Sequence, residues 1–279
     1  MFPKVYKEFK PDHHLAQHVK CYWVYEKEFA SGEFEHVLPD SSYELVYVQA
    51  GGYRVGDNVL PRLFLVGHLN KPLDFYATGV VKQWCIRFYP WGFRPFGNVE
   101  RLARHEWLPA TDAMDEETCM RLEQIMQNED AERVTKELDS YLTELLLKRH
   151  FDDKVLNQAF RKLQKQKGDI KIRDLANFCF ISTRHLHRKV ATATGKSPRE
   201  IASRLRFEKT RDVLMHSPDT PLAHLASEHG YTDQSHLVKE FRNYMDMAPS
   251  RYAELVRKQQ PQMKNIQNVL FLQDDSAAF

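Results

Sequence analysis

The amino-acid sequence predicts a multidomain β + α protein, in which an N-terminal β-barrel and a helical segment precede an all-α domain with two helix-turn-helix units. Three observations predict this fold class. Residues 19–90 hold short aromatic and β-branched runs between turn residues, apolar residues recur at helical spacing in 112–150, and one pattern occurs twice between 172 and 253. We therefore divide the chain into the β-barrel, a helical linker or dimerisation segment, the double helix-turn-helix domain and a tail, at residues 1–110, 111–150, 151–260 and 261–279.

The β-barrel is predicted from runs rich in aromatic and β-branched residues, at 21–29, 43–48, 63–66 and 80–89. Gly, Pro, Asn and Asp clusters separate these runs, as is typical of a sandwich or barrel. About half of the aromatic side chains should face inward, where they either line a ligand pocket or simply fill a small barrel. Arg87 either binds a carboxylate ligand or pairs with Glu44. The candidate pocket residues are Trp23, Tyr25, Tyr43, Tyr47, Trp84 and Arg87.

Residues 112–150 predict two antiparallel amphipathic helices. Thr111 or Asp112 is the expected cap of the first helix, and the acidic residues that follow suit the helix dipole. The apolar faces of these helices pack either on the barrel or on a second subunit. In the tail, a strand-like run at 268–273 either adds a strand to the barrel or is disordered.

The repeat in the C-terminal half predicts helix, tight turn, helix in each copy. In the first copy, residues 173–179 form the supporting helix and Ser182 caps the second helix. Leu186 and Val190, four residues apart, then face the core. In the second copy, residues 222–229 form the supporting helix, Gly230 and Thr232 supply turn and cap, and Leu237 and Phe241 point inward.

The outward face of each second helix is expected to read base edges in the major groove of duplex DNA. Arg188 is the principal reader because Arg bonds guanine bidentately, whereas Arg184 either reads a base or holds a phosphate. In the second unit Gln234 could read adenine, and Lys239 could read guanine or hold a phosphate. The full set of candidate base-reading residues is Thr183, Arg184, His187, Arg188, Gln234, Ser235 and Lys239.

A long helix, residues 199–216, is predicted to begin at Pro198 and to fix the distance between the two reading helices. Residues 182–211 carry nine Lys or Arg and two Asp or Glu. The net charge is −5 over residues 1–150 and +7 over 151–279, which together give the total of +2. This asymmetry indicates a polyanion-binding half. The candidate phosphate contacts are Ser182, Lys196, Arg199, Arg206, Thr232 and Arg242.

Residues 155–256 resemble the DNA-binding domain of the AraC/XylS family of transcriptional regulators. The matching residues are Leu175-Ala176, Ser182 to Leu186, Arg188, Gly195 to Pro198, Arg206, Leu225-Ala226, Gly230-Tyr231, Phe241-Arg242, Pro249 and Tyr252. The resemblance implies seven helices with two helix-turn-helix units, usually under a β-barrel sensor domain and a dimerising helical segment. Phe180 departs from it by replacing the turn glycine of the first unit, Asp246 replaces another glycine, and Ala253 stands where Arg is frequent. We therefore expect the turn at Phe180, and with it the angle of the first reading helix, to differ.

The N-terminal region resembles the cupin-like domains of this family in outline, but it shows no pattern typical of an enzyme. No His-x-His motif occurs in a predicted strand, and phosphate-binding glycine loops and nucleophile elbows are missing from the sequence. We expect no catalytic residue, no metal and no cofactor. The four cysteines are scattered, no signal peptide is recognisable and no stretch of about 18 apolar residues occurs, which together favour a cytoplasmic protein without a membrane partner.

These features predict a cytoplasmic, homodimeric regulator of transcription that binds specific double-stranded DNA sequences under the control of a small-molecule effector. RNA polymerase is a further partner if the protein acts as an activator. One alternative is a ligand-independent DNA-binding protein whose barrel serves only to dimerise. The other is a cupin-like binding protein or enzyme with a weakened DNA domain.

Overall fold

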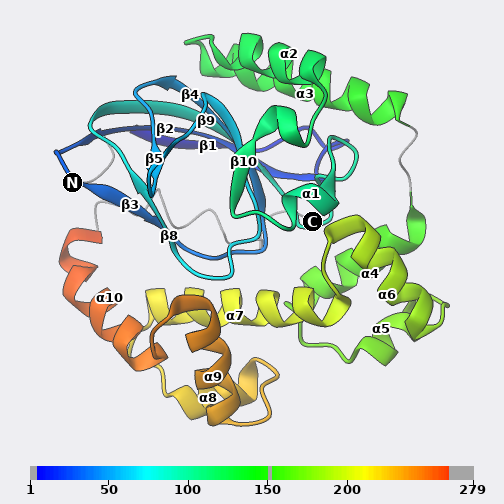
Figure 1. Ribbon diagram of the computed structural model, residues 1–279. Coiled ribbons are helices and arrows are strands. Elements are labelled where there is room, and N and C mark those ends of the chain that lie inside the picture. Colours follow the sequence, from blue (N-terminus) through cyan, green and yellow to red (C-terminus); the bar gives the residue numbers. More distant parts are fainter. Residues whose placement is uncertain (1–4, 150–152, 264–279) are drawn as a thin grey trace.

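The computed structural model describes residues 5–149 and 153–263, the last five of them by their backbone alone. Figure 1 shows a β domain flanked on one side by two helices and on the other by the C-terminal helices. The strands are β1 (Val5–Phe9), β2 (Val19–Phe29), β3 (Phe34–Val37), β4 (Tyr43–Ala50), β5 (Arg54–Val55), β6 (Asn58–Val59), β7 (Leu63–Val66), β8 (Leu73–Tyr76), β9 (Gly79–Phe88) and β10 (Trp107–Pro109). The helices are α1 (Val99–Leu102), the short 3₁₀ helix η1 (Ala110–Asp112), α2 (Glu116–Met126), α3 (Ala131–Lys148), α4 (Lys154–Lys165), α5 (Ile172–Phe178), α6 (Thr183–Thr194), α7 (Pro198–His216), α8 (Leu222–Glu228), α9 (Gln234–Met245) and α10 (Pro249–Met263).

The β domain consists of two antiparallel sheets. The larger has the strand order β1-β2-β9-β4-β7-β10, and the smaller has the order β3-β8-β5-β6. Alternation along β2 separates two cores. Tyr22 and Val24 belong to the core under α2 and α3, whereas Trp23 and Tyr25 belong to the core between the sheets. Strand β2 is therefore buried on both faces.

Helices α2 and α3 pack on the larger sheet (Figure 1). Leu122 and Ile125 of α2 and Leu138 and Leu142 of α3 share one core with Trp84 of β9. This answers the question that the sequence left open, because the apolar faces lie against the β domain and are not free for a second subunit. The predicted cap was also wrong. Asp115 caps α2 by accepting a hydrogen bond from the backbone N–H of Thr118 at 2.8 Å.

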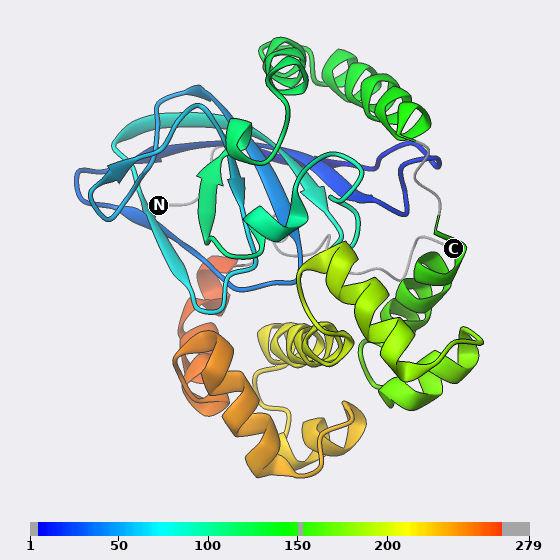
Figure 2. The same cartoon turned by 45° about the vertical axis from the view of Figure 1, so that its right-hand side comes forward.

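The C-terminal helices form two small cores on either side of α7, as Figure 2 shows by viewing α7 nearly end-on. One core contains α4, α5 and α6, and the other contains α8, α9 and α10. Ser197 caps α7 in a capping box with Glu200, and Pro198 occupies the first turn as the sequence predicts. At 19 residues α7 is about 28 Å long. Helix α10 continues to Met263, beyond the expected domain end at 260, and the run at 268–273 lies outside the described residues.

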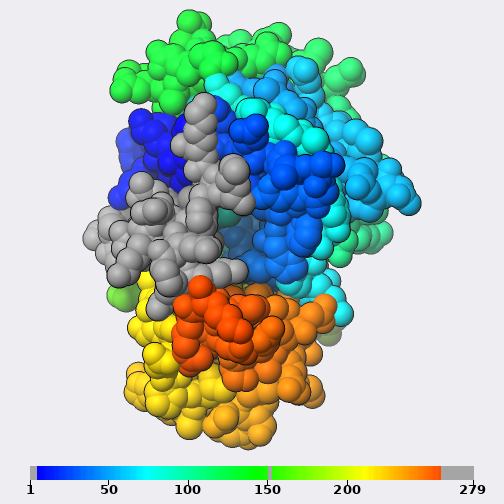
Figure 3. All heavy atoms as spheres, turned by 90° about the vertical axis from the view of Figure 1, so that its left-hand side faces the viewer, coloured from blue at the N-terminus to red at the C-terminus, as the bar shows by residue number. Residues whose placement is uncertain are grey.

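The two halves of the chain share packing. Trp91, which follows β9, stacks on Phe160 of α4 with ring centroids 4.4 Å apart and an interplanar angle of 8°. Two buried arginines of α7 reach the β domain. Arg211 donates to the carbonyl of Pro39 at 3.0 Å, and Arg204 donates to the carbonyls of Asp40 and Leu69. Figure 3 shows α9 and α10, coloured orange to red, directly below the β domain.

The turn of the first helix-turn-helix unit keeps the left-handed conformation despite the loss of glycine. Phe180 has φ 54°, and Gly230 has φ 71° at the corresponding turn of the second unit. The expectation that the turn differs at Phe180 was therefore wrong for its backbone. The ring of Phe180 is 94% exposed, so it makes no packing contribution that could offset the strain.

Replacing Phe180 by glycine is expected to leave stability unchanged or to raise it by as much as about 1 kcal/mol. A left-handed backbone costs Phe about 1 kcal/mol or more, whereas Gly adopts it freely but loses more entropy on folding. Urea denaturation of the two proteins measures the difference. A loss above about 1 kcal/mol would show that the exposed ring makes a contact that stabilises the fold.

Candidate nucleic-acid interface and ligand cavity

Helix α6 displays the predicted base-reading side chains of the first unit on one exposed face. Ser182 caps the helix by accepting from the backbone N–H of His185 at 3.2 Å. Leu186 and Val190 are fully buried, as their spacing predicts. The opposite face carries the exposed side chains of Thr183, Arg184, His187 and Arg188. The helix can therefore insert its first two turns into a groove without disturbing the core.

Helix α9 repeats this arrangement in the second unit. Leu237 and Phe241 are buried, and Gln234, Ser235, Lys239 and Arg242 are exposed. These four side chains line one shallow surface depression together with Val238 and Asn243. The structure thus brings the base-reading candidates of the second unit together on one helical face.

The structure bears on two of the predicted phosphate contacts. Thr232 is exposed just before α9 but is not the cap of that helix. Asp233 is the cap, and it accepts from the backbone N–H of His236 at 2.8 Å. The side chain of Arg206 is only 16% exposed, and its guanidinium lies 3.6 Å from the carboxylate of Glu240. It also donates to the carbonyl of Gly168 and lies over the ring of Tyr231. Arg206 holds the core of the second unit.

The other predicted phosphate contacts lie at the start of α6, around the start of α7 and on α9. Arg199 is exposed in the first turn of α7, and Lys196 is half-buried just before it. Arg242 is exposed on α9, where it belongs to the depression described above. Ser182, Arg199 and Arg242 can therefore meet a DNA backbone without rearrangement, whereas Lys196 must extend its partly covered side chain.

Helices α6 and α9 both contact the β domain at their C-terminal ends. The hydroxyl of Tyr43 on β4 donates to the carbonyl of Thr194, the last residue of α6, at 2.8 Å. The ammonium of Lys71 lies 2.9 Å from the carboxylate of Asp246, which follows α9. The N-terminal ends, which carry the base-reading candidates, consequently point away from the β domain. Movement in the β domain can reach both helices directly.

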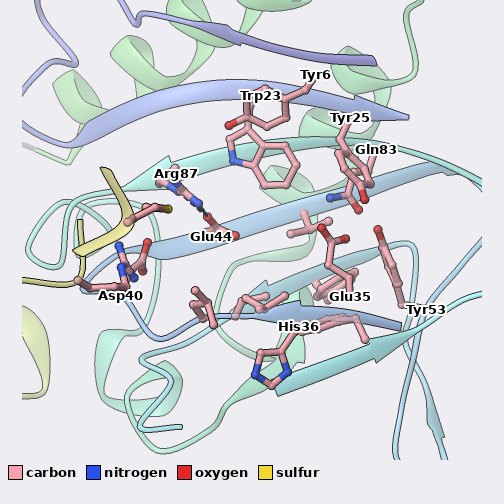
Figure 4. Close-up of a pocket in the computed structure, with 18 residues that line it drawn as sticks. Tyr6, Trp23, Tyr25, Glu35, His36, Asp40, Glu44, Tyr53, Gln83 and Arg87 are labelled. Carbon is pink, nitrogen blue, oxygen red and sulfur yellow. Dashed lines mark hydrogen bonds and ion pairs between the residues drawn. The ribbon is translucent and has the colours of Figure 1, made fainter. Parts of the chain in front are cut away.

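A cavity of about 230 Å³ lies between the two sheets and opens towards α7 (Figure 4). Its walls are largely aromatic, from Trp23, Tyr25, Tyr53, Phe64 and Phe75. Arg211 and Met215 of α7 complete the lining, so the cavity touches the helix that joins the two DNA-binding units. A molecule bound at the α7 end of the cavity would therefore contact both halves of the chain.

Three of the six predicted pocket residues line this cavity and three do not. Trp23, Tyr25 and Arg87 line it. Tyr43, Tyr47 and Trp84 instead lie in the core under α2 and α3, on the opposite face of the larger sheet. The choice by residue type was therefore wrong for these three, because alternate positions on one strand face opposite sides.

The charged groups nearest α7 are mutually compensated. Arg87 and Glu44 form an ion pair of 2.5 Å, as one of the two sequence-based readings of Arg87 predicts. Burial raises the pKa of Asp40, but the positive charges of Arg87, Lys20 and Arg211 outweigh this effect and hold it below its ordinary value. This end of the cavity is therefore electrostatically satisfied without a ligand.

Sequence reasoning missed the polar groups at the other end of the cavity, Glu35, Tyr53 and Gln83. Glu35 lies in β3 and Tyr53 lies just before β5, two short strands of the smaller sheet. The sequence pattern does not predict either strand. The position of Gln83 could have been predicted from strand alternation. Gln83 and Arg87 are four residues apart in β9, so their side chains lie on the same face of the strand.

Within the described part of the chain, one group has metal-ligand spacing: the exposed, consecutive residues Asp12, His13 and His14. They lie before β2 and outside the cavity. Among the helices that the structure describes, none is long and apolar enough to cross a membrane.

Comparison with known proteins agrees with the two-part organisation. A family model described as a helix-turn-helix domain matches residues 175–255, and a model for a domain of unknown function, DUF6597, matches residues 7–103. The chain is 11% identical to ToxT from Vibrio cholerae, with a TM-score of 0.44 over 90% of this chain and 99% of that one. It is 21% identical to the DNA-binding domain of AdpA, solved in complex with a target DNA, with a TM-score of 0.36 over 40% of this chain and 99% of that one.

Curated relatives match part of the chain. An uncharacterised HTH-type transcriptional regulator of Haemophilus influenzae is 32% identical over 105 residues, which are 37% of this chain and 35% of that protein. The HTH-type transcriptional activator RhaS of Escherichia fergusonii is 36% identical over 69 residues, which are 25% of this chain and 24% of RhaS. The match thus spans between a quarter and about a third of these relatives. Residues 175–255 thus match a helix-turn-helix domain, and the curated relatives that match part of the chain are HTH-type transcriptional regulators.

Proposed function

We propose that this protein regulates transcription by binding specific sequences of double-stranded DNA through α6 and α9. The observation that carries this proposal is the pair of exposed polar faces on these two helices, joined by α7. Consecutive major grooves on one face of B-DNA lie about 34 Å apart, and the length of α7, about 28 Å, is of that order. Phosphate contacts by basic residues around these helices would supply the sequence-independent part of the affinity.

Control by a small molecule is the second part of the proposal. The cavity lies between the sheets, and Arg211 and Met215 of α7 are part of its lining. A ligand that prefers one arrangement of α7 against the β domain would shift the population of that arrangement. Because Tyr43 and Lys71 connect the β domain to the ends of α6 and α9, the shift would change the relative placement of the reading helices.

We further propose a homodimer in the cytoplasm, with each subunit meeting one half-site. The inner faces of α2 and α3 are occupied by the β domain, so the dimer contact would use their outer face. Met120 and Leu147 are 53% and 70% exposed on these helices. Dimerisation is measured by light scattering of the wild type and of the Met120→Glu, Leu147→Glu double variant. If the double variant remained a dimer, the dimer interface would not involve the outer faces of α2 and α3.

Replacing Arg188 by alanine tests the DNA-reading geometry. The substitution is expected to cost about 1–3 kcal/mol on a sequence that the wild type selects, and to relax preference at one base pair. Arg199→Ala is the matched control, because loss of a phosphate contact weakens binding to all sequences alike and lowers the salt dependence. Fluorescence anisotropy on the selected duplex and on its single-base variants measures both. Unchanged affinity of the Arg188 variant would refute the placement of α6 in the groove.

A further inference from the structure

The cavity lining holds three buried polar side-chain atoms that have no partner. The hydroxyl of Tyr53 and the amide oxygen Oε1 of Gln83 lie at the end distant from α7, and the indole Nε1 of Trp23 lies nearer to Arg87 (Figure 4). The three side chains are 9%, 4% and 5% exposed, and all three line the cavity. A buried polar group without a hydrogen bond costs free energy, so a set of them on one cavity wall indicates that a ligand completes them.

Glu35 lies at the same end. Figure 4 shows its carboxyl group, the hydroxyl of Tyr53 and the amide of Gln83 close to one another at one end of the cavity. The Tyr25 hydroxyl hydrogen-bonds to Glu35, and burial raises the pKa of this carboxyl above its ordinary value. In the described part of the chain, Glu35 forms no ion pair, since the nearby ammonium of Lys27 is bound to Glu33 at 3.2 Å. Among the described residues, the carboxyl is thus an acidic group in an aromatic enclosure, with the ammonium of Lys27 nearby but paired with Glu33.

We infer that the cavity binds a small organic amine, whose ammonium group is held by Glu35, Gln83 and Tyr53 and whose apolar body lies between the aromatic walls. An ammonium has three N–H donors and no acceptor. It can donate to the carboxylate of Glu35, to Oε1 of Gln83 and to the phenolic oxygen of Tyr53, all of which accept. The rings of Trp23, Tyr25 and Tyr53 also favour a cation over a neutral group. This inference rests on the proposed ligand control and names the class of effector.

A ligand with a negatively charged group does not fit the lining of this cavity. A carboxylate ligand would need a free cation, but Arg87 is engaged by Glu44 and Arg211 by the carbonyl of Pro39 and by Asp212. At the Glu35 end, a carboxylate would meet a like charge. The size of the cavity restricts the ligand further. A cavity of about 150 Å³ holds benzene, so about 230 Å³ admits one ring with a short substituted chain.

The inference is tested on the full-length protein without DNA, with benzylamine and phenethylamine as probes. Their matched alcohols and carboxylates, benzyl alcohol, 2-phenylethanol, benzoate and phenylacetate, serve as the neutral and anionic comparisons. Thermal denaturation and intrinsic tryptophan fluorescence, to which Trp23 on the cavity wall contributes, report binding. We expect the amines to raise the melting temperature and the alcohols and carboxylates to have a smaller effect. A larger effect of either comparison class, or no effect of any amine at millimolar concentration, would overturn the assignment.

Two substitutions separate binding from structure. Glu35→Gln should weaken amine binding by about tenfold or more, because it removes the charge that the ammonium meets. In the free protein the same substitution should raise the melting temperature at alkaline pH. Folding raises the pKa of this carboxyl. At a pH where the carboxyl is ionised in both the folded and the unfolded protein, it therefore destabilises the folded state. A structural role for Glu35 predicts the opposite, a loss of stability.

Tyr53→Phe keeps the ring and removes a hydroxyl that lacks a partner, so it should weaken amine binding without lowering stability. Glu28→Gln is the matched control, because Glu28 is an exposed carboxylate of β2 outside the cavity. Equal amine affinity in the Glu35 and Glu28 variants would contradict the inference. Because no DNA is present, failure of the amine assignment leaves the proposed DNA recognition untouched.

Discussion

Replacing Trp91 by alanine is expected to destabilise the protein by about 3–5 kcal/mol, the largest effect we predict for a single side chain. Trp91 belongs to the β domain by sequence but lies in the core of the first helix-turn-helix unit, 7% exposed. Its ring lies between those of Tyr89 and Phe160, nearly parallel to both. The substitution removes this stack and leaves a cavity at the junction of the two halves.

Chemical denaturation followed by far-UV circular dichroism measures this effect. We expect the variant to lose stability and to unfold in two separate transitions, because the two halves no longer support each other. Trp91→Phe is the control, since a phenyl ring keeps most of the stacking on Phe160. A loss of less than about 1 kcal/mol in the alanine variant would show that the two halves are held together by other contacts.

Replacing Arg206 by methionine is expected to cost about 3 kcal/mol of stability, because it leaves the carboxylate of Glu240 buried without its cation. Glu240 is 8% exposed, and its Oε1 already lacks a hydrogen bond. Adding Glu240→Gln to the variant should restore part of the loss, since the uncompensated charge is then gone. Urea denaturation of the two single variants and the double variant measures the coupling between the residues.

The same variant distinguishes a core role from a phosphate contact. If Arg206 contacted a DNA phosphate, its replacement would release about one counterion fewer on binding. The slope of the logarithm of the binding constant against the logarithm of salt concentration would then become less steep. We expect the folded Arg206→Met protein to keep the wild-type salt dependence, whereas Arg199→Ala should lower it. If the Arg206→Met variant had the stability of the wild type and a lower salt dependence of DNA binding, Arg206 would instead be a phosphate contact.

The exposed faces of α6 and α9 could be predicted because they depend only on helical period. Once Leu186, Val190, Leu237 and Phe241 are assigned to the core, the opposite positions must be exposed. Whether an exposed candidate touches a base or a phosphate is a separate matter, and it stays a prediction for each of them. Arg206 could not be placed in this way, because its partner Glu240 lies on another helix and period gives no information about pairing between helices.

The cavity was harder to predict than the DNA-binding half. Strand alternation fixes which residues share a face, but the sequence does not show which face of the larger sheet meets α2 and α3. Tyr43, Tyr47 and Trp84 therefore looked as suitable as Trp23 and Tyr25. The contributions of α7 to the lining, Arg211 and Met215, depend on how the two halves pack, which no local pattern reveals.

Selection of bound sequences from a random library of DNA duplexes, using the full-length protein, tests the central claim most directly. The protein is used whole because Trp91 is part of the core of the first helix-turn-helix unit. DNA reading by α6 and α9 predicts enrichment of a motif with two blocks about one helical turn apart, and loss of one block's preference in the Arg188→Ala variant. Bound duplexes without any enriched motif, with and without an amine, would contradict sequence-specific recognition by this protein.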